Sequence, residues 1–489
     1  MNAKFKKIIL ILLPVLAILF LSYGNFLKFH LASDAYRIID NTNQFMINLK
    51  LIEGRLIQVL YFVILSIFGI SINSINSYMF LYRINTIASI ILLVVCTIFI
   101  YKILKKYIKD ITTSKKIFLI ICCLLLTVNV SICEYMLYFE NVIIIFGLLL
   151  SIFSVYIYTK NIKFKHAIII ILLIISSFCY QGVNQIFITL SFLIFILKDK
   201  NNTNSKCYFK ELFKIGMLYL IPLLVNYVIS YILNNILPNL DPRLFTGILN
   251  NIKLNISPRN ISLLGISFAI PACMILANFK LLDNRNISKH VFNIFLLVII
   301  SLLSFIIFIF NNSCNLPPRV MYNFYIIYPL LGIYIINLKN NKKYFVDIIV
   351  GSLMLIINII LVITLQNINI DYTNKNIQIV ESFIYEIENY EKEHNTKINN
   401  IAFYTDSKFN SIYWMWNIPI CSTYTSPIYY GYWANIYSIN VLSERNFTKI
   451  TEDKENKEIY NYFNSINWDG PNAHEQIKFT GDTANICTF

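Results

Sequence analysis

The chain has 489 residues, of which 57% are hydrophobic and only 14% charged, and this composition excludes an ordinary soluble globular protein. The formal charge of +15 is unevenly distributed: residues 367–489 hold nine Lys or Arg against fifteen Asp or Glu, a balance of −6, so the rest of the chain carries +21. Lysines that gather on one face of a bilayer explain this division better than nucleic-acid binding does. The sequence therefore predicts a polytopic membrane protein with no nucleic-acid partner.

Apolar runs of about 17 to 25 residues predict the membrane-spanning helices. Lys4, Lys6 and Lys7 precede the first run, which has no small-residue cleavage site after it and is interpreted as an uncleaved span. The run from Leu56 to Gly69 is only about fourteen residues long, which favours an interfacial or re-entrant helix. The remaining runs predict about eleven spans, at residues 8–27, 79–101, 117–133, 141–158, 166–180, 183–197, 215–236, 261–279, 291–310, 322–338 and 345–366.

The orientation follows from the loops that are rich in lysine. If residues 56–69 do not cross, every lysine-rich loop lies on the same side as the N-terminus, which the positive-inside rule places in the cytoplasm. These loops are residues 102–116, 160–165, 198–214, 280–289 and 339–343. An odd number of spans in the inner (plasma) membrane then places residues 367–489 outside, on the same face as the loops at 28–78, 134–140, 181–182, 237–260 and 311–321.

The tail after residue 366 has a different character. The spacing of Ile377, Val380, Ile384 and Ile387 predicts a helix within residues 371–394, and residues 398–404 have the pattern of a short strand. The predicted fold is therefore an α-helical polytopic membrane domain, residues 1–366, with interfacial helices in its first outside loop, followed by a small extracytoplasmic α/β domain, residues 367–489.

Several common chemistries have no motif in this chain. The five histidines form no HExxH pattern, and the sequence contains no GxGxxG, GxxxxGK[ST] or GxSxG. A zinc enzyme, a nucleotide-dependent enzyme and a serine hydrolase are thereby disfavoured. Cys421 and Cys487 are the only cysteines of the predicted outside domain, and one disulfide or two free thiols are both open.

The outside loops contain a concentration of charge, which is costly near lipid and usually marks function. An enzyme that moves a sugar from a phospholipid carrier needs a carboxylate to take a proton from the acceptor hydroxyl, and cations to stabilise the leaving phosphate. The predicted outer face offers both types, in the acids Asp34, Asp40, Glu53, Glu134 and Glu140 and the arginines Arg37, Arg55 and Arg319.

Five short motifs in this order resemble the bacterial serotype-converting glucosyltransferase family. They are Ser33-Asp34-Ala35-Tyr36-Arg37, Glu53-Gly54-Arg55-Leu56, the segment from Glu134 through Tyr138 to Glu140-Asn141, Tyr180-Gln181, and Pro318-Arg319-Val320. The resemblance covers most of the membrane region. It implies a polytopic enzyme similar to the GT-C superfamily, which transfers glucose from a polyprenyl-phosphate donor to a surface polysaccharide such as O-antigen or to a lipid-linked glycan.

The resemblance and the predicted topology together suggest roles for individual residues. We expect Asp34 to act as the general base in an inverting transfer, with Glu134 and Glu140 as further catalytic carboxylates. Arg37, Arg55 and Arg319 would bind the donor phosphate, and Asp40, Glu53, Tyr180 and Gln181 would contact the substrate. Where the family pattern has two adjacent acids, this chain has Asp34-Ala35, so no metal ligand is assigned, although a divalent cation as cofactor remains open.

Two alternatives also fit a basic, aromatic-rich polytopic chain. A polysaccharide flippase or transporter is one, but transporters usually place polar groups in the middle of spans, whereas the charges here gather in one outside layer. The other is a polysaccharide polymerase, which only an assay of single-sugar transfer against chain growth would separate.

Overall fold

The computed structural model describes residues 3–32, 34–51, 53–198, 205–236, 287–304, 318–338, 344–405, 435–450, 457–466 and 472–488. The chain forms two compact units. Unit 1 consists of Met1–Leu27, Met46–Phe68 and Arg83–Ile363, and unit 2 of Lys28–Phe45, Gly69–Tyr82 and Thr364–Phe489. Two helices, α4 (Ile75–Leu104) and α15 (Phe345–His394), contribute residues to both units.

Unit 1 is built from helices. Besides its parts of α4 and α15, it contains α1 (Ala3–Tyr23), α3 (Leu56–Ile67), α5 (Thr113–Thr127), α6 (Val130–Leu137), α7 (Asn141–Tyr158), α8 (Lys165–Cys179), α9 (Gln185–Lys198), α10 (Ser205–Ile236), α13 (Ile287–Leu303) and α14 (Tyr322–Leu338). Short helical turns connect some of them: η1 (Gly24–Leu27), η2 (Met46–Leu51), η3 (Gln181–Asn184) and η6 (Pro318–Val320).

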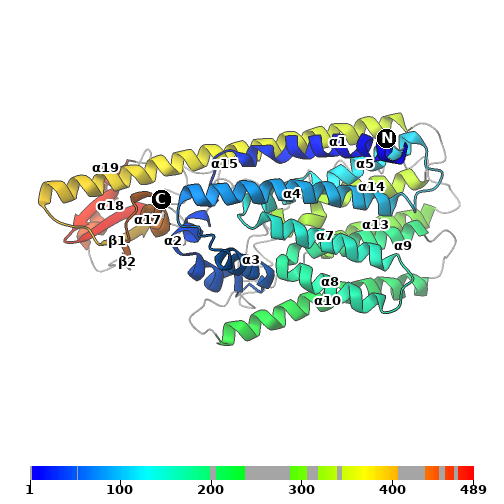
Figure 1. Cartoon of the computed structure of the whole chain (residues 1–489), viewed down its shortest axis with the longest axis horizontal. Helices are drawn as coiled ribbons and strands as arrows, with labels where there is room; N and C mark the ends of the chain where they lie inside the picture. The colour runs from blue at the N-terminus through cyan, green and yellow to red at the C-terminus, as the bar shows by residue number, and fades with distance from the viewer. Residues whose placement is uncertain are drawn as a thin grey trace. The chain divides into compact units, whose positions relative to one another are not determined.

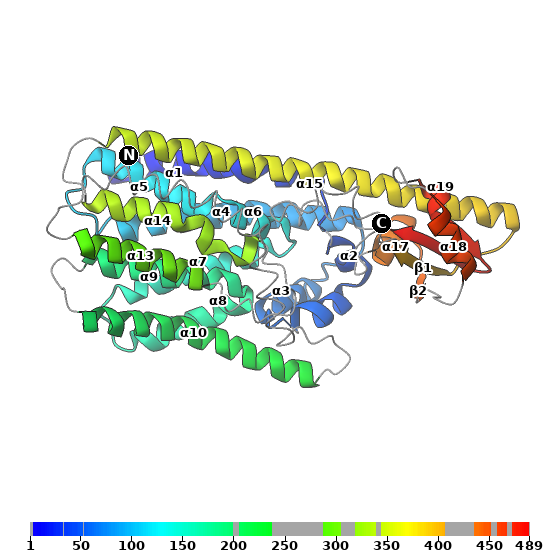
Figure 2. The same cartoon turned by 180° about the vertical axis from the view of Figure 1, so that it is seen from behind.

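Small residues allow the helices of unit 1 to pack closely. Helix α7 lies beside α8 and α9, and α14 beside α5, α9 and α13 (Figures 1 and 2). A side chain added at Gly147 of α7 would meet Cys179 of α8 at 2.7 Å between Cβ atoms, and one at Gly332 of α14 would meet the Phe118 ring of α5 at 3.1 Å. Such contacts are typical of helices that pack in a membrane, where close van der Waals fit replaces the hydrophobic effect between helices.

The helices agree with the predicted spans as far as the described residues extend. Five helices are long and apolar enough to cross a membrane, or six if α5 and α6, bent by 44°, form one broken span. Shorter apolar helices occupy the other predicted spans, except that residues 261–279 lie outside the described residues. The mostly helical, membrane-type fold is thus confirmed, whereas the count of about eleven spans and the placement in a bilayer stay predictions.

Helix α3, formed by the run after Leu56, is shorter than a bilayer is thick. It has twelve residues, so it is about 18 Å long at 1.5 Å per residue. The hydrocarbon core of a bilayer is about 30 Å thick. Gly69, with φ +68°, follows the end of the helix in the left-handed conformation that glycine adopts without strain.

Unit 2 contains the small sheet that the tail predicts. The strands are β1 (Asn400–Thr405), β2 (Thr448–Ile450), β3 (Ile477–Thr480) and β4 (Thr483–Thr488), and the helices are α2 (Ala35–Phe45), α17 (Asn435–Ser443), α18 (Lys457–Ser465) and α19 (Ala473–Gln476) with the end of α15. The order is β2-β1-β4-β3, with β1 parallel to both of its neighbours and β3 antiparallel to β4. Its core joins Val380, Phe383 and Ile387 of α15 to Ile401 of β1 and Ile486 of β4.

Helix α15 is one continuous element where the sequence predicts a span followed by a separate helix. It has 50 residues without proline, and it is therefore about 75 Å long. Only its apolar first part fits the thickness of a bilayer, and the remainder presents a hydrophobic stripe to the sheet of unit 2.

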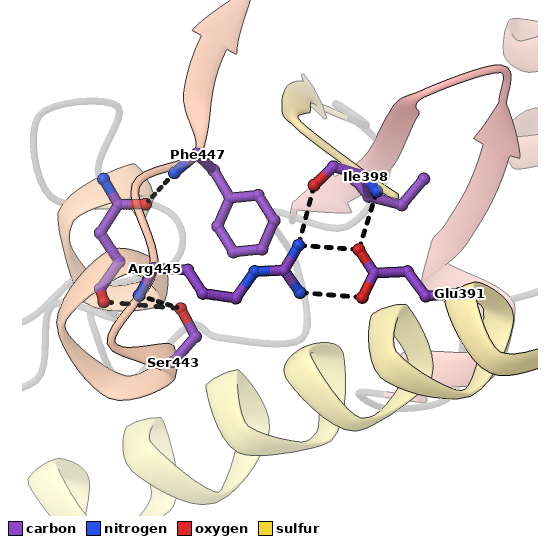
Figure 3. A network of polar contacts seen from close by, with 6 residues as sticks. Glu391, Ile398, Ser443, Arg445 and Phe447 are labelled. Atoms are coloured by element: carbon purple, nitrogen blue, oxygen red, sulfur yellow. Dashed lines mark hydrogen bonds and ion pairs between the residues drawn. The ribbon is translucent and has the colours of Figure 1, made fainter. Parts of the chain in front are cut away.

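An ion pair fixes the end of α15 to the sheet. The two guanidinium nitrogens of Arg445 donate to the two carboxylate oxygens of Glu391 at 3.0 and 2.7 Å, and the Ile398 amide donates to the same carboxylate at 2.7 Å (Figure 3). Arg445 also donates to the Ile398 carbonyl at 2.9 Å and lies over the ring of Phe447. One arginine thus connects α15, the approach to β1 and the segment before β2.

Candidate functional site

A buried carboxylate and an arginine form the first half of the site. Glu134 on α6 is fully buried, and one of its oxygens accepts a hydrogen bond from the Arg319 backbone amide at 2.7 Å while the other pairs with the Arg319 guanidinium. The Tyr135 hydroxyl donates to the Arg319 carbonyl at 2.7 Å, and the guanidinium carbon lies 5.3 Å from the centre of the Tyr138 ring. A buried charge requires such a partner, so α6 and η6 hold each other in place.

The turn before α3 forms the second half. Glu53 and Arg55 are paired at 2.8 Å, and the Arg55 guanidinium carbon lies 4.9 Å from the centre of the Tyr180 ring. The Gln181 side-chain amide donates to the Glu53 carbonyl at 2.6 Å and to the Asn226 side-chain oxygen at 3.0 Å. Asn226 on α10 in turn donates to the Gly54 carbonyl at 2.9 Å.

Tyr180 joins the two halves. Its ring packs edge to face against that of Tyr135, with 5.4 Å between the ring centres. The Arg55 guanidinium makes a cation–π contact with the same Tyr180 ring. A side chain added at Gly182 would come within 2.9 Å of the Arg319 carbonyl, which shows how closely η3 approaches η6. We call this set the two-arginine cluster; it comprises Glu53, Arg55, Glu134, Tyr138, Glu140, Tyr180, Gln181 and Arg319.

The electrostatics of the cluster keep both guanidinium groups charged. Burial alone would lower the pKa of Arg55, but Glu53, Tyr180 and Glu140 raise it above its ordinary value, against repulsion from Arg319. Burial likewise opposes the charge on Arg319, yet Tyr138 and Glu134 raise its pKa well above the ordinary value. Two guanidinium groups therefore stay charged in one largely buried region, each paired with a carboxylate: Arg55 with Glu53 and Arg319 with Glu134.

Glu140 occupies the residue before α7. It is 1% exposed and close enough to Arg55 to support its positive charge. The nearby Tyr61 hydroxyl, which donates to Asn85 at 2.9 Å, has its pKa raised to about 12 by burial, with Glu140 contributing. Glu140 therefore belongs to the cluster through its effect on Arg55, whereas Glu134 belongs to it through Arg319.

Three of the predicted site residues, Asp34, Arg37 and Asp40, lie in unit 2. The Arg37 guanidinium carbon lies 5.9 Å from the centre of the Phe45 ring and 5.6 Å from that of Tyr437 on α17. Burial raises the pKa of Asp40, and a hydrogen bond with Asn440 of α17 opposes the shift. The start of the segment between α1 and α3 thus contacts α17 within unit 2, whereas its end, with Glu53 and Arg55, belongs to unit 1.

Several polar residues that support the cluster were missed by the sequence analysis. Asn226 donates a hydrogen bond to the carbonyl of Gly54. The side-chain nitrogen of Gln185 donates to the Val320 carbonyl at 2.5 Å, and its side-chain oxygen accepts from the Asn323 backbone amide at 3.1 Å. All three lie in apolar helices. An amide inside an apolar run is a usable signal, because it is costly there unless it bonds to another segment.

The part of the chain that the structure describes shows no group of three His, Cys, Asp or Glu residues arranged to hold a metal ion. Within unit 1, Glu134 is bound on both oxygens by Arg319, which makes it a poor metal ligand.

Comparison of the chain with protein-family models, with curated proteins and with solved structures gives no match. The family resemblance of the five motifs therefore stays an expectation from the sequence. What the structure adds is that four of these motifs contribute residues to one cluster in unit 1.

Proposed function

We propose that this chain is a membrane glycosyltransferase that takes a sugar from a polyprenyl-phosphate donor and transfers it to a cell-surface polysaccharide. The sugar expected from the motifs is glucose, and the expected acceptor is O-antigen or a lipid-linked glycan. The observation that carries the proposal is that Arg55 and Arg319 belong to one cluster, although their segments are far apart in the sequence.

The arginines suit a phosphate ligand. A planar guanidinium matches two phosphate oxygens and stabilises the charge that develops when the sugar leaves. Arg319 is committed to Glu134, but the Nε atom of Arg55 is buried and makes no hydrogen bond among the described residues. A buried donor without a partner is rare in folded proteins, and a phosphate oxygen of the donor is the partner we assign to it.

The proposed reaction is a displacement at the anomeric carbon. The acceptor oxygen forms the new bond to that carbon, the bond to the phosphate oxygen breaks with its electron pair going to the phosphate, and the acceptor proton passes to a carboxylate. Asp34 is the predicted base, and Glu140 is the second candidate. Glu134 has both oxygens bound by Arg319, so we assign it a positioning role in place of the catalytic role predicted from the sequence.

The helices of unit 1 support an orientation for the site. At one end of α7, α8 and α9 lie Glu140, Tyr180 and Gln185, which belong to the two-arginine cluster or hydrogen-bond beside it. At or near the other end of each helix lie lysines. The positive-inside rule then assigns the lysine end to the cytoplasm and the two-arginine cluster to the outer face of the plasma membrane. The N-terminus would be cytoplasmic and residues 367–489 extracytoplasmic.

A transfer assay tests the proposal. Membranes that contain the protein are incubated with a radiolabelled polyprenyl-phosphate sugar and the acceptor glycan, with and without EDTA. We expect addition of one sugar per acceptor site, at least 100-fold loss with Asp34→Asn, and loss of donor affinity with Arg55→Lys, which keeps the charge but not the two-pronged geometry.

The controls separate the roles. Arg83→Lys is a matched control for Arg55→Lys, since Arg83 is exposed and donates to the Leu27 carbonyl. If Asp34→Asn stays active while Glu140→Gln is inactive, the base is Glu140. Growth of long chains would indicate a polymerase, and no transfer with any polyprenyl-phosphate sugar would contradict the proposal.

A further inference from the structure

A second charged cluster lies at the far end of the helices that carry the proposed site. Helix α7 has 18 residues, so Tyr158 lies about 27 Å along its axis from Glu140. Near Tyr158 lie Lys165 at the start of α8 and Glu211 and Lys214 on α10, and Lys198 at the end of α9 is close enough to repel Lys165 while its ammonium nitrogen lies 5.0 Å from the centre of the Tyr107 ring. We call Tyr158, Lys165, Lys198, Glu211 and Lys214 the lysine cluster.

The contacts within the lysine cluster leave it positive. The Tyr158 hydroxyl donates to Glu211, and Lys214 pairs with the same carboxylate oxygen at 3.3 Å. The ammonium nitrogens of Lys165 and Lys214 each lie 5.9 Å from the centre of the Tyr158 ring. Among the described residues, Glu211 is the only acid that acts on Lys165, whereas Lys214 and Lys198 both repel it. Lys165 and Lys214 thus share the Glu211 carboxylate, which already binds Tyr158 and Lys214, and Lys198 adds a third positive charge near Lys165.

An exposed apolar face adjoins these charges on α10. Phe209 and Phe213 are 68% and 71% exposed, and they lie four residues apart, on the same side of the helix. Lys214 follows directly in the sequence. Aromatic rings beside ammonium groups match the two parts of a phospholipid, its acyl chains and its phosphate.

We infer that the lysine cluster and the adjoining face of α10 bind an anionic phospholipid, with the phosphate between Lys165, Lys198 and Lys214. The three lysines carry more positive charge than the Glu211 carboxylate neutralises, and this excess attracts the headgroup. Phe209 and Phe213 contact the acyl chains. Glu211 and Tyr158 hold Lys214 in place from the protein side. This inference does not depend on the proposed sugar transfer, because the lysine cluster and the two-arginine cluster share no residue.

The test is lipid retention by the full-length protein in neutral detergent, measured by native mass spectrometry. Phosphatidylglycerol and phosphatidylcholine with the same acyl chains are titrated separately. We expect the protein to bind phosphatidylglycerol at least 10-fold more tightly. The double variant Lys165→Gln, Lys198→Gln removes two charges without breaking the Glu211–Lys214 pair and lowers that affinity about 30-fold.

The matched control is Lys105→Gln, Lys106→Gln. These two lysines are exposed and lie over the rings of Tyr101 and Tyr156, outside the lysine cluster. The control changes the net charge equally, and we expect less than a 2-fold effect. Thermal midpoints without added lipid show whether each variant is folded.

Three results would overturn the inference. The first is equal affinity for the two lipids, and the second is equal loss in the two double variants, which would mean a general surface-charge effect. The third is displacement of the lipid by inorganic phosphate at the same concentration, which would show a phosphate site in place of a lipid site.

Discussion

At the scale of single residues, Gly54 shows how much the two-arginine cluster depends on backbone geometry. It has φ +69°, a conformation that other residues adopt only with strain. The space around it is also full, since an added Cβ would lie 2.3 Å from the Ser230 hydroxyl and 2.8 Å from the Asn226 side-chain oxygen. Glycine here allows Glu53 and Arg55 to project from one tight turn that Asn226 and Gln181 hold.

Replacing Gly54 by alanine tests this dependence. We expect Gly54→Ala to cost about 2 to 4 kcal/mol, because the strain of positive φ adds to the displacement of Ser230 and Asn226. Gly69→Ala is a close control, since Gly69 has φ +68° with nothing within 4 Å of an added Cβ, and it should cost only about 1 kcal/mol from strain. Thermal midpoints in detergent measure both, and equal midpoints would show that the crowding around Gly54 contributes nothing.

The residues of the site could be predicted only in part. Glu53, Arg55, Glu134 and Arg319 were selected by their charge and their predicted outer position, because charges near lipid are uncommon, and the structure brings these four residues into one cluster. The pairing could not be predicted, since Glu134 and Arg319 are 185 residues apart and nothing local in the sequence encodes their contact. Asn226 was overlooked because a single amide hardly changes the hydropathy of its apolar run.

At the scale of elements, local signals predicted where helices form but not how they continue or pair. Residues 345–366 and 371–394 were predicted as two elements because hydropathy changes between them, yet no proline interrupts the backbone and α15 runs through. The contact of α2 with α17 joins parts of the chain about 400 residues apart, which only the folded chain reveals.

The junction of α15 with the sheet should depend on pH through Glu391. Burial opposes ionisation, but hydrogen bonds from Arg445 and from the Ile398 amide lower the pKa of Glu391 below its ordinary value of 4.5. A lowered folded-state pKa gives stability that is complete above the unfolded-state value and is lost as the pH falls through the folded-state value. We therefore expect the stabilisation to be complete at pH 6 to 7 and to decline as the pH falls below about 4.5.

The variant Glu391→Gln measures that contribution. We expect a loss of about 1 to 2 kcal/mol at neutral pH, since Arg445 loses its charged partner but stays partly solvated. The difference from the unchanged protein should shrink as the pH falls toward 3. Glu388→Gln, at an exposed acid on the same helix, serves as the control, and a difference for Glu391→Gln that does not change with pH would remove the ion pair as its cause.

At the scale of the whole molecule, the charge distribution and the helix ends of unit 1 point to the same orientation. The lysine-rich loops fall at one end of α7, α8 and α9, and the two-arginine cluster and its supports at the other. Composition and hydropathy were sufficient to predict a mostly helical chain with membrane-length apolar helices, because the bilayer restricts helix length, whereas the orientation stays a prediction. The two compact units, by contrast, divide the segment between α1 and α4 between them, a division that no composition change marks.

Labelling of single cysteines from each side of the membrane tests the orientation. Asn43 on α2 and Lys163 between α7 and α8 are both exposed, so either can carry a reactive cysteine. The native Cys96, Cys122, Cys123, Cys133, Cys179 and Cys487 are buried, and Cys207, Cys273, Cys314 and Cys421 are changed to serine in the background protein.

In intact cells, an impermeant maleimide should label Asn43→Cys and leave Lys163→Cys unlabelled until the membrane is opened. The reverse pattern would place Asn43 in the cytoplasm and exclude transfer to an extracellular polysaccharide, because the unit that carries Asp34 would then lie on the wrong side of the bilayer from its acceptor.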